Sequence, residues 1–324
     1  MGLLVNGQWQ DKWYETDKSN GEFVREDAQL RNWITHDGSA GDSGKGGFSA
    51  KKGRYHLYVS YACPWAHRTL IFRHLKGLED YISVSGVHPY MLDKGWTFEK
   101  DEHGATGDDL FGHDFMHQVY TQNKTDYTGR VTVPVLWDKQ QQCIVSNESS
   151  EIIRMFNSAF NHLTGNTDDY YPEPLRSEID DINELVYHNI NNGVYRSGFA
   201  TTQDAYEKAF TQLFDALETI EQRLENNRYL VGDTLTEADW RLFTTLVRFD
   251  AVYVGHFKCN LKRIADYKNI SGYCRELYQY PGVKETVNLE HIKSHYYYSH
   301  DMINPTRVVP KGPALDLDGA HGRG

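Results

Sequence analysis

Cysteine is scarce in this sequence, and its spacing excludes two common kinds of protein. The 324-residue chain has four cysteines, at positions 63, 143, 259 and 274. They are too few and too widely spaced for the disulfide framework of a small secreted domain, and they lack the paired spacing of a zinc site. We therefore expect reduced thiols, no bound metal and a cytoplasmic protein.

Basic clusters and long apolar runs are also missing. The formal net charge is −11 and no Lys/Arg-rich run occurs, which argues against nucleic acid and anionic membranes as partners. The apolar stretches are far too short to cross a bilayer, and residues 1–6 do not resemble a signal peptide. Hydrophobic residues make up 39% of the chain, as in a globular protein, and its length suggests two domains.

The stretch around Cys63 is the most informative part of the sequence. Residues 55–59 have the pattern of a buried strand, and residues 64–76 repeat apolar side chains on one helical face before Gly77. Pro64 suits the first position of that helix, which places Cys63 at its N-cap. Because the positive end of a helix stabilises a thiolate, Cys63 is a candidate nucleophile. The alternative is an inert, buried structural cysteine.

A second cysteine does not follow Cys63, since position 66 is alanine. Once oxidised, the Cys63 sulfur therefore needs an outside thiol to resolve it. This arrangement resembles the thioredoxin fold in its monothiol form, which uses glutathione. A further alternating segment over residues 82–87 predicts a parallel strand–helix–strand unit with a right-handed crossover.

A second pattern lies in residues 129–137, where Val131, Val133 and Val135 alternate as in a strand and Pro134 interrupts them. Proline inside such a pattern belongs to an edge strand, a bulge or a cis turn. In thioredoxin-like proteins a Val-Pro at this place is a cis proline that faces the nucleophile. Val133 would then offer its backbone to an extended peptide, as an added strand does.

Residues 146–150 are cap-type residues that precede an apolar helical pattern. The first N–H groups of that helix and the Ser149 hydroxyl would bind an anion, and Glu148 beside them would bind an ammonium group. Such a pair suits the α-amino-acid end of a ligand. Simple helix capping is the alternative interpretation.

The pattern changes along the chain predict its domain organisation. We expect an N-terminal arm over 1–50, a thioredoxin-like domain over 51–164 with an insertion at about 97–128, and a linker over 165–174. An all-helical domain over 175–300 and a tail over 301–324 follow, and residues 316–324 are expected to be disordered. Within the insertion, His113 and His117 are expected to be solvated, since no third metal ligand accompanies them. Thr236 and Asp239 have the spacing of a capping box at a helix start.

Four motifs together resemble the cytosolic glutathione transferases. They are, in chain order, Cys63-Pro64-Trp65-Ala66-His67-Arg68, Val133-Pro134, Glu148-Ser149 and Leu235-Thr236-Glu237-Ala238-Asp239. The long insertion after Gly95-Trp96, the segment Tyr127–Arg130 and the tail from His295 to Pro305 narrow the match. They resemble the Xi class, the glutathionyl-hydroquinone reductases, and we expect a bacterial member.

The resemblance implies an α/β N-terminal thioredoxin-like domain, an all-α C-terminal domain, and a homodimer formed largely through the helical half. It implies glutathione as co-substrate, bound by Trp96, Arg130, Val131, Thr132, Val133, Glu148 and Ser149. It further implies that Tyr195 donates a proton, and that Tyr253 and Tyr296 form hydrogen bonds near the sulfur and favour its thiolate. Without the resemblance, nothing distinguishes these three residues among the 22 tyrosines of the chain.

The reaction implied by the resemblance is reductive removal of glutathione from a quinol. The Cys63 thiolate attacks the sulfur of a glutathionyl-hydroquinone, and a second glutathione resolves the resulting mixed disulfide. Two alternatives remain open. A general thioltransferase or dehydroascorbate reductase of omega type shares the Cys63 chemistry but lacks the quinol pocket. A non-catalytic interaction module on the same scaffold would have an inert Cys63.

Overall fold

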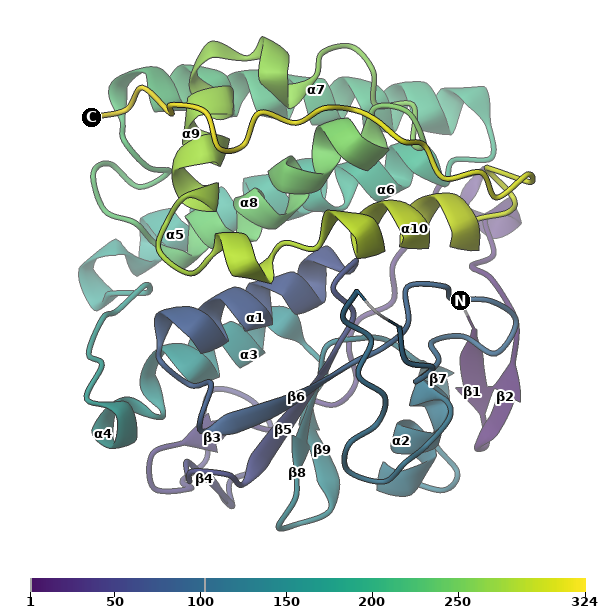
Figure 1. Ribbon diagram of the computed structural model, residues 1–324, viewed down its shortest axis with the longest axis vertical. Coiled ribbons are helices and arrows are strands. Elements are labelled where there is room, and N and C mark those ends of the chain that lie inside the picture. Colours follow the sequence, from purple (N-terminus) through teal and green to yellow (C-terminus); the bar gives the residue numbers. More distant parts are fainter. Residues whose placement is uncertain (1, 102) are drawn as a thin grey trace. The chain divides into compact units, whose positions relative to one another are not determined.

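A computed structural model describes residues 2–101 and 103–324, which divide between two units (Figure 1). Unit 1 contains residues up to Trp13, then Glu26–Asp169 and Thr286–Ser299, and unit 2 contains Tyr14–Arg25, Tyr170–Glu285 and His300–Gly324. The division differs from the predicted domains at two places. Residues 286–299, which lie in the predicted helical domain, belong to unit 1, and residues 14–25 of the predicted N-terminal arm belong to unit 2. No helix within the described ranges is long and apolar enough to cross a membrane.

The centre of unit 1 is a four-stranded sheet in the order β6-β5-β8-β9. Strand β5 (Tyr55–Val59) is buried at all five positions and pairs in parallel with β6 (Ile82–Gly86), as the strand–helix–strand pattern predicts. Strand β8 (Val135–Asp138) runs antiparallel to β5, and β9 (Cys143–Ser146) runs antiparallel to β8. A mixed sheet of this order is that of a thioredoxin-like domain, which the sequence predicted.

Helices α1 (Pro64–Leu75) and α3 (Ser149–Ser158) lie side by side on this sheet (Figure 1). Helix α2 (Met116–Asn123), which forms inside the predicted insertion, contacts β9. The short α4 (Asn161–Thr164) follows α3, and α10 (Leu289–Ser299) completes unit 1. The predicted pattern after Cys63 is confirmed, because α1 ends at Leu75 and Gly77 follows with a φ of +64°.

Residues 3–10 form a hairpin that no local pattern predicted. Strands β1 (Leu3–Val5) and β2 (Gln8–Gln10) pair with β7 (Gly129–Arg130) in the order β2-β1-β7. A two-stranded parallel pair, β3 (Ile34–Thr35) and β4 (Phe48–Ser49), lies in the same unit. The single strand expected over 129–137 is wrong, since it is divided into β7 and β8 around Pro134, which lacks an N–H donor for a ladder.

Unit 2 is helical, as the change of periodicity predicted. Its α-helices are α5 (Arg176–Val186), α6 (Gly193–Gly198), α7 (Gln203–Asn226), α8 (Glu237–Arg248) and α9 (Lys268–Tyr278). Two π-helical turns, η3 (Tyr187–Asn191) and η4 (Phe249–Tyr253), continue α5 and α8. Short 3₁₀ turns are η1 (Asp17–Ser19), η2 (Glu173–Leu175) and η5 (Ile264–Asp266), and η6 (Lys284–Thr286) ends where unit 1 resumes.

The predicted start of α8 is confirmed in its cap. The Asp239 carboxylate accepts the Thr236 N–H at 2.8 Å and the Thr236 hydroxyl at 3.1 Å. The other carboxylate oxygen of Asp239 accepts the Leu230 N–H and the Tyr273 hydroxyl, both at 2.8 Å. Leu230 and Thr236 precede α8, Asp239 lies in its first turn and Tyr273 lies on α9, so the cap also ties the turn before α8 to α9.

The expectation of disorder over residues 316–324 is wrong. The tail runs along the helices of unit 2 (Figure 1). Gln279 in the turn after α9 donates its amide to the carbonyl oxygens of Leu317 (2.8 Å) and Gly319 (2.7 Å), and Arg323 pairs with Glu276 at 2.7 Å. Charged and amide partners on α9 therefore hold a segment whose own composition gives no sign of order.

The expectation of a solvated histidine pair in the insertion is also wrong. His117 stacks on Trp9 at 5.0 Å and on Phe115 at 5.2 Å, and His113 lies against Phe111 at 5.4 Å, measured between ring centroids. Burial lowers the pKa of His117, so its neutral ring is favoured. The sequence around His117 could not reveal this packing, because Trp9 comes from the distant N-terminal hairpin.

Candidate active site

Cys63 occupies the N-cap of α1, directly after the turn that follows β5. Its carbonyl oxygen accepts the His67 N–H at 2.9 Å, and its own N–H donates to the Ser60 carbonyl oxygen at 3.1 Å. Pro64 is the first residue of the helix, and the Cys63 side chain is half-buried. The predicted placement of the thiol at a helix N-terminus is therefore confirmed.

The Cys63 thiol faces the backbone of Val133. Its Sγ lies 3.5 Å from the Val133 carbonyl oxygen, to which the thiol donates. The Val133–Pro134 peptide bond is cis, and Val133 is 5% exposed. This confirms the interpretation of Pro134 as a cis proline that faces the nucleophile, and it excludes the ordinary edge strand.

Arg68, one turn further along α1 than Cys63, packs over an aromatic ring. The guanidinium carbon of Arg68 lies 4.5 Å from the centre of the Trp65 ring, and Arg68 is buried. On the same helix, the His67 ring forms a 2.8 Å hydrogen bond with the Thr286 hydroxyl. Thr286 belongs to a segment more than 200 residues away in sequence, so no local pattern identified it as a partner of the first helical turn.

The other cysteines lie in environments that suppress ionisation. Burial raises the pKa of the Cys259 and Cys274 thiols to about 12. Burial and the nearby Asp138 carboxylate raise the pKa of the Cys143 thiol. Cys63, at the end of a helix, is thus distinguished from the three other thiols by its surroundings.

Glu148 and Ser149 begin α3, and the capping interpretation is confirmed for Glu148. One oxygen of the Glu148 carboxylate accepts the Ser150 N–H at 2.9 Å and the Ser150 hydroxyl at 2.8 Å. Glu148 remains half-buried, and Ser149, the first residue of the helix, is buried. A carboxylate beside helix N–H groups, as predicted, is present, and its role toward a ligand stays a prediction.

The segment Arg130–Val133 links β7 to the cis peptide, and Tyr120 of α2 holds its centre. The fully buried Tyr120 hydroxyl donates to the Thr132 carbonyl oxygen at 2.9 Å. The Tyr120 hydroxyl oxygen also accepts the Thr132 N–H at 3.3 Å and the Asn147 side-chain amide at 3.2 Å. Tyr120 therefore connects two predicted glutathione-binding segments. No sequence motif pointed to Tyr120, which lies within the predicted insertion.

Arg130 and Trp96 have well-defined partners. The Arg130 guanidinium donates to the carbonyl oxygens of Lys12 (2.5 Å) and Trp13 (3.3 Å), and it lies 3.3 Å from the Glu26 carboxylate. The ring of Trp96 is 4% exposed and stacks on His295 of α10, with 4.7 Å between ring centroids. Both residues lie in unit 1, as do Cys63, Val131 and Ser149.

The three predicted tyrosines divide between the units. Tyr296 of α10 is buried in unit 1. Tyr195 of α6 and Tyr253 at the end of η4 are both buried in unit 2, with their ring centroids 6.2 Å apart. The structure thus brings Tyr195 and Tyr253 together within the helical unit.

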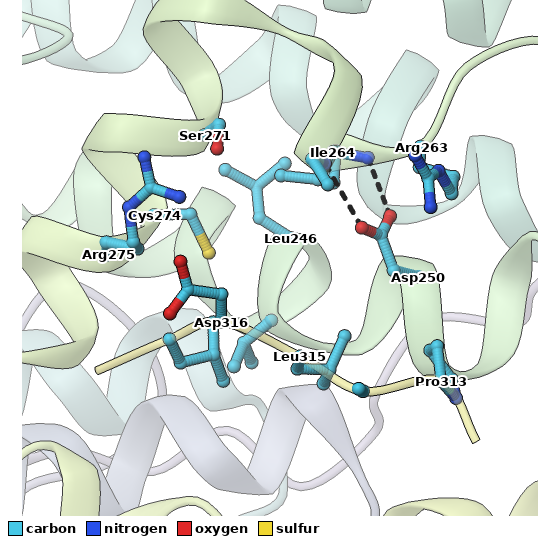
Figure 2. Close-up of a pocket in the computed structure, with 14 residues that line it drawn as sticks. Leu246, Asp250, Arg263, Ile264, Ser271, Cys274, Arg275, Pro313, Leu315 and Asp316 are labelled. Atoms are coloured by element: carbon cyan, nitrogen blue, oxygen red, sulfur yellow. Dashed lines mark hydrogen bonds between the residues drawn. The ribbon is translucent and has the colours of Figure 1, made fainter. Parts of the chain in front are cut away.

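A cavity of about 140 Å³ lies elsewhere in unit 2, between α8, α9 and the C-terminal tail (Figure 2). The Asp250 carboxylate points to the start of η5, where it accepts the N–H groups of Ile264 (2.6 Å) and Ala265 (3.1 Å). Cys274 also lines the cavity, and burial raises the pKa of its thiol to about 12. None of the predicted site residues lines this cavity, and the Asp250 carboxylate is occupied by the first N–H groups of η5.

Metal binding within the described residues, 2–101 and 103–324, would need several ligand side chains that lie close together. No group of three or more His, Cys, Asp or Glu side chains there is arranged to hold an ion.

Family models match both halves of the chain. The model described as "Glutathione S-transferase, N-terminal domain" matches residues 62–159, and the one described as "Glutathione S-transferase, C-terminal domain" matches residues 203–276. Together they include the predicted motifs around Cys63, Val133, Glu148 and Thr236.

Relatives match over nearly the whole chain. The glutathionyl-hydroquinone reductase YqjG of Escherichia coli (strain K12) is 56% identical over 323 residues, which are 100% of this chain and 98% of that protein. The glutathionyl-hydroquinone reductase PcpF of Sphingobium chlorophenolicum is 54% identical and covers 98% of each.

Solved structures agree with this match. The glutathione-bound structure of YqjG superposes with a TM-score of 0.92 at 54% identity and covers 99% of each chain. A Xi-class glutathione transferase from Natrialba magadii superposes with a TM-score of 0.90 at 47% identity, covering 100% of this chain and 96% of that one. The chain therefore belongs to the glutathione transferase family, and within it to the Xi class.

Proposed function

We propose that this chain reduces glutathionyl-hydroquinones to hydroquinones, with glutathione as co-substrate and Cys63 as nucleophile. The observation that carries the proposal is the position of the Cys63 sulfur, at the start of α1 and 3.5 Å from the Val133 carbonyl oxygen. The helix N-terminus favours the thiolate, and the backbone beside it suits an extended peptide. Two relatives more than 50% identical over the full chain carry the name of this activity.

Glutathione is bound along the backbone from Arg130 to Val133 and at the start of α3. Val131, Thr132 and Val133 provide the strand-like edge for the cysteinyl part of the tripeptide. The positive charge of Arg130 attracts a carboxylate of the tripeptide, and the carbonyl oxygens of Lys12 and Trp13 orient its guanidinium.

The γ-glutamyl end is bound at the start of α3. The Ser149 hydroxyl and the helix N-terminus bind its carboxylate, and Glu148 binds its ammonium group. Trp96 provides an apolar wall for the tripeptide, and its stacking on His295 fixes the orientation of that wall.

The reaction proceeds in two halves. First, the Cys63 thiolate attacks the glutathionyl sulfur, the carbon–sulfur bond breaks, and its electron pair goes to the ring carbon. Tyr195 gives this carbon a proton, and hydroquinone leaves while glutathione stays on Cys63 as a mixed disulfide. Second, a glutathione thiolate attacks that disulfide, which releases oxidised glutathione and restores the Cys63 thiolate. Hydroxyl groups of Tyr253 and Tyr296 hydrogen-bond near the sulfur and favour its ionised form.

The remaining assignments are a homodimer formed largely through the helical half, and a location in the reducing cytoplasm. A homodimer is typical of the resembled family, and mass photometry of the purified chain tests it at working concentration. The cytoplasmic assignment rests on four widely spaced cysteines, none of them in a disulfide.

Replacement of the nucleophile tests the proposal. Cys63→Ala should abolish turnover of a glutathionyl-hydroquinone and leave glutathione binding measurable by calorimetry. Cys143→Ala, at a half-buried thiol in β9, is the matched control and should keep full activity. A Cys63→Ala enzyme with wild-type turnover would end the proposal.

A comparison of two substrates distinguishes the omega-type alternative. A general thioltransferase or dehydroascorbate reductase would turn over a small glutathione mixed disulfide faster than a glutathionyl-hydroquinone. We expect the opposite order of kcat/KM, measured with both substrates on the wild-type enzyme.

A further inference from the structure

We infer that Arg25 is a positioning residue that holds a positive charge over the Tyr195 ring and strengthens this tyrosine as a proton donor. The inference rests on the proposed function, which assigns proton donation to Tyr195. It adds a residue from the N-terminal arm that none of the sequence motifs pointed to.

The geometry ties the cation to the helix that carries the tyrosine. The guanidinium carbon of Arg25 lies 5.0 Å from the centre of the Tyr195 ring and 5.6 Å from that of Phe23. Its Nε donates to the side-chain oxygen of Asn192 at 3.0 Å. Because Asn192 is the N-cap of α6 and Tyr195 lies in its first turn, the charge and the phenol are fixed on one short element.

The arm segment itself is anchored within unit 2. The Thr201 N–H donates to the Gly21 carbonyl oxygen at 3.1 Å, and Lys208 of α7 pairs with Glu22 at 2.8 Å. These contacts lie three and four residues before Arg25. The position of the guanidinium is therefore set by the fold of the arm and does not depend on its side chain alone.

Apolar rings enclose the pair and strengthen the effect of the charge. Tyr195 is 8% exposed, and four aromatic rings lie around it, with centroid distances of 5.6–6.4 Å, from Phe23, Phe199, Tyr253 and Phe257. A charge acts over a longer range among such rings than in water, because the local dielectric constant is low. Arg25 is half-buried, so part of its charge is also withdrawn from solvent.

The chemistry gives the charge a task in one half of the reaction. When the Tyr195 hydroxyl gives its proton to the ring carbon, a phenolate remains, and it regains a proton from water before the next turnover. A cation over the ring stabilises the phenolate more than the phenol, so it lowers the barrier of the step that forms it. The second half, attack of glutathione on the Cys63 mixed disulfide, transfers no proton to carbon and does not involve Tyr195.

The test compares the two half-reactions in variants of the full-length enzyme. Arg25→Met and Arg25→Gln should each slow single-turnover release of hydroquinone by about tenfold, because the developing phenolate loses the cation that stabilises it. Both should resolve the Cys63 mixed disulfide, and reduce a small glutathione mixed disulfide, at the wild-type rate. Arg25→Lys, which keeps the charge, should release hydroquinone at close to the wild-type rate.

A matched control and a second position separate the inference from the function on which it rests. Arg176→Met removes another cation over a tyrosine ring, 5.1 Å from Tyr171, and should leave both half-reactions unchanged. Tyr195→Phe should slow the first half, and adding Arg25→Met to it should slow that half no further.

The outcomes against the inference are distinct. An equal loss in both half-reactions of Arg25→Met and Arg25→Gln, with a lower melting temperature, would reduce Arg25 to a structural residue and overturn the inference. If Tyr195→Phe slows the release of hydroquinone but Arg25→Met does not, the inference is overturned and the assignment of Tyr195 as proton donor stands. A Tyr195→Phe enzyme with the wild-type first rate would overturn the assignment of the proton donor and the inference together.

Discussion

The Cys63 sulfur and the Val133 carbonyl oxygen lie 3.5 Å apart although 70 residues separate them in sequence. The sheet brings them together, because β5 leads into Cys63, β8 follows the cis Val133–Pro134 bond, and Tyr58 of β5 pairs with Val135 of β8. The Cys63 thiol and the backbone before the cis proline thus meet at one end of two neighbouring strands.

Alkylation should select Cys63 among the four thiols. Cysteines at helix N-termini titrate at about 3.5–7.5, below the usual value of about 8.5. Burial raises the pKa of Cys259 and Cys274 to about 12 and raises that of Cys143. At pH 7, iodoacetamide should therefore modify Cys63 faster than it modifies glutathione. Peptide mass spectrometry over time measures the rate at each cysteine. A Cys63 rate no faster than that of a free thiol would support the non-catalytic module.

Glutathione affinity should depend on the charge of Glu148. Glu148→Gln keeps an oxygen that accepts the Ser150 N–H, so the start of α3 is retained, but it removes the partner proposed for the glutathione ammonium. We expect Kd for glutathione, measured by calorimetry on the Cys63→Ala background, to rise about tenfold.

Glu173→Gln, at an exposed position outside α3, is the control for a general change of charge. An unchanged Kd in Glu148→Gln would restrict Glu148 to its capping role.

The insertion should matter through Tyr120. Tyr120→Phe removes a hydroxyl that serves Thr132 and Asn147 in a fully buried place, which leaves the Asn147 amide without that acceptor. The free energy of unfolding should fall by about 1–3 kcal/mol in urea titrations, and glutathione should bind less tightly.

The comparison variant is Tyr206→Phe, which loses a 2.7 Å hydrogen bond to the Lys258 carbonyl oxygen at a more exposed site. Equal stability and affinity in both variants would contradict the role given to Tyr120.

Acid should destabilise unit 1 through His56. Its ring is fully buried in β5, where Nδ1 hydrogen-bonds the Ser83 hydroxyl at 2.7 Å and Nε2 has no hydrogen-bond partner among the described residues. Burial lowers the pKa of His56 from 6.5 to about 4. Between these values the unfolded chain binds a proton that the folded chain does not, so stability is complete above pH 6.5 and is lost as pH falls through about 4.

The loss attributable to His56 should be about 2–3 kcal/mol between pH 6.5 and 4, measured by urea unfolding. His56→Asn keeps a partner for Ser83 but does not titrate, so its stability should fall less over this range. His36→Asn, at an exposed histidine, should retain the wild-type slope. If the free energy of unfolding of His56→Asn falls with pH as steeply as that of the wild type, another group is responsible for the acid sensitivity.

Local rules were enough to predict the elements that hold the candidate site. Strand β5, the Cys63 N-cap and the start of α3 each depend on residues within one turn or strand, and all are found where the sequence placed them. The cis bond before Pro134 required more than local pattern, because proline in a strand also fits an edge.

Contacts between distant segments could not be predicted. The pairing of β1 with β7 joins residues more than 120 positions apart, and neither strand is long enough to show a pattern of its own. The order of the C-terminal tail depends in the same way on Glu276 and Gln279 of the α9 region, and the burial of His117 on Trp9. The anchoring of the Thr132 segment by Tyr120 is decided by tertiary packing that one sequence does not reveal.

The proposed mixed disulfide on Cys63 is the species whose detection tests the central claim most directly. The enzyme is mixed with one equivalent of a glutathionyl-hydroquinone in the absence of free glutathione, quenched in acid and examined by intact-protein and peptide mass spectrometry. The account predicts one glutathione per chain, attached at Cys63, together with one equivalent of released hydroquinone. Release of hydroquinone without an adduct, or an adduct on Cys143, Cys259 or Cys274, would contradict it.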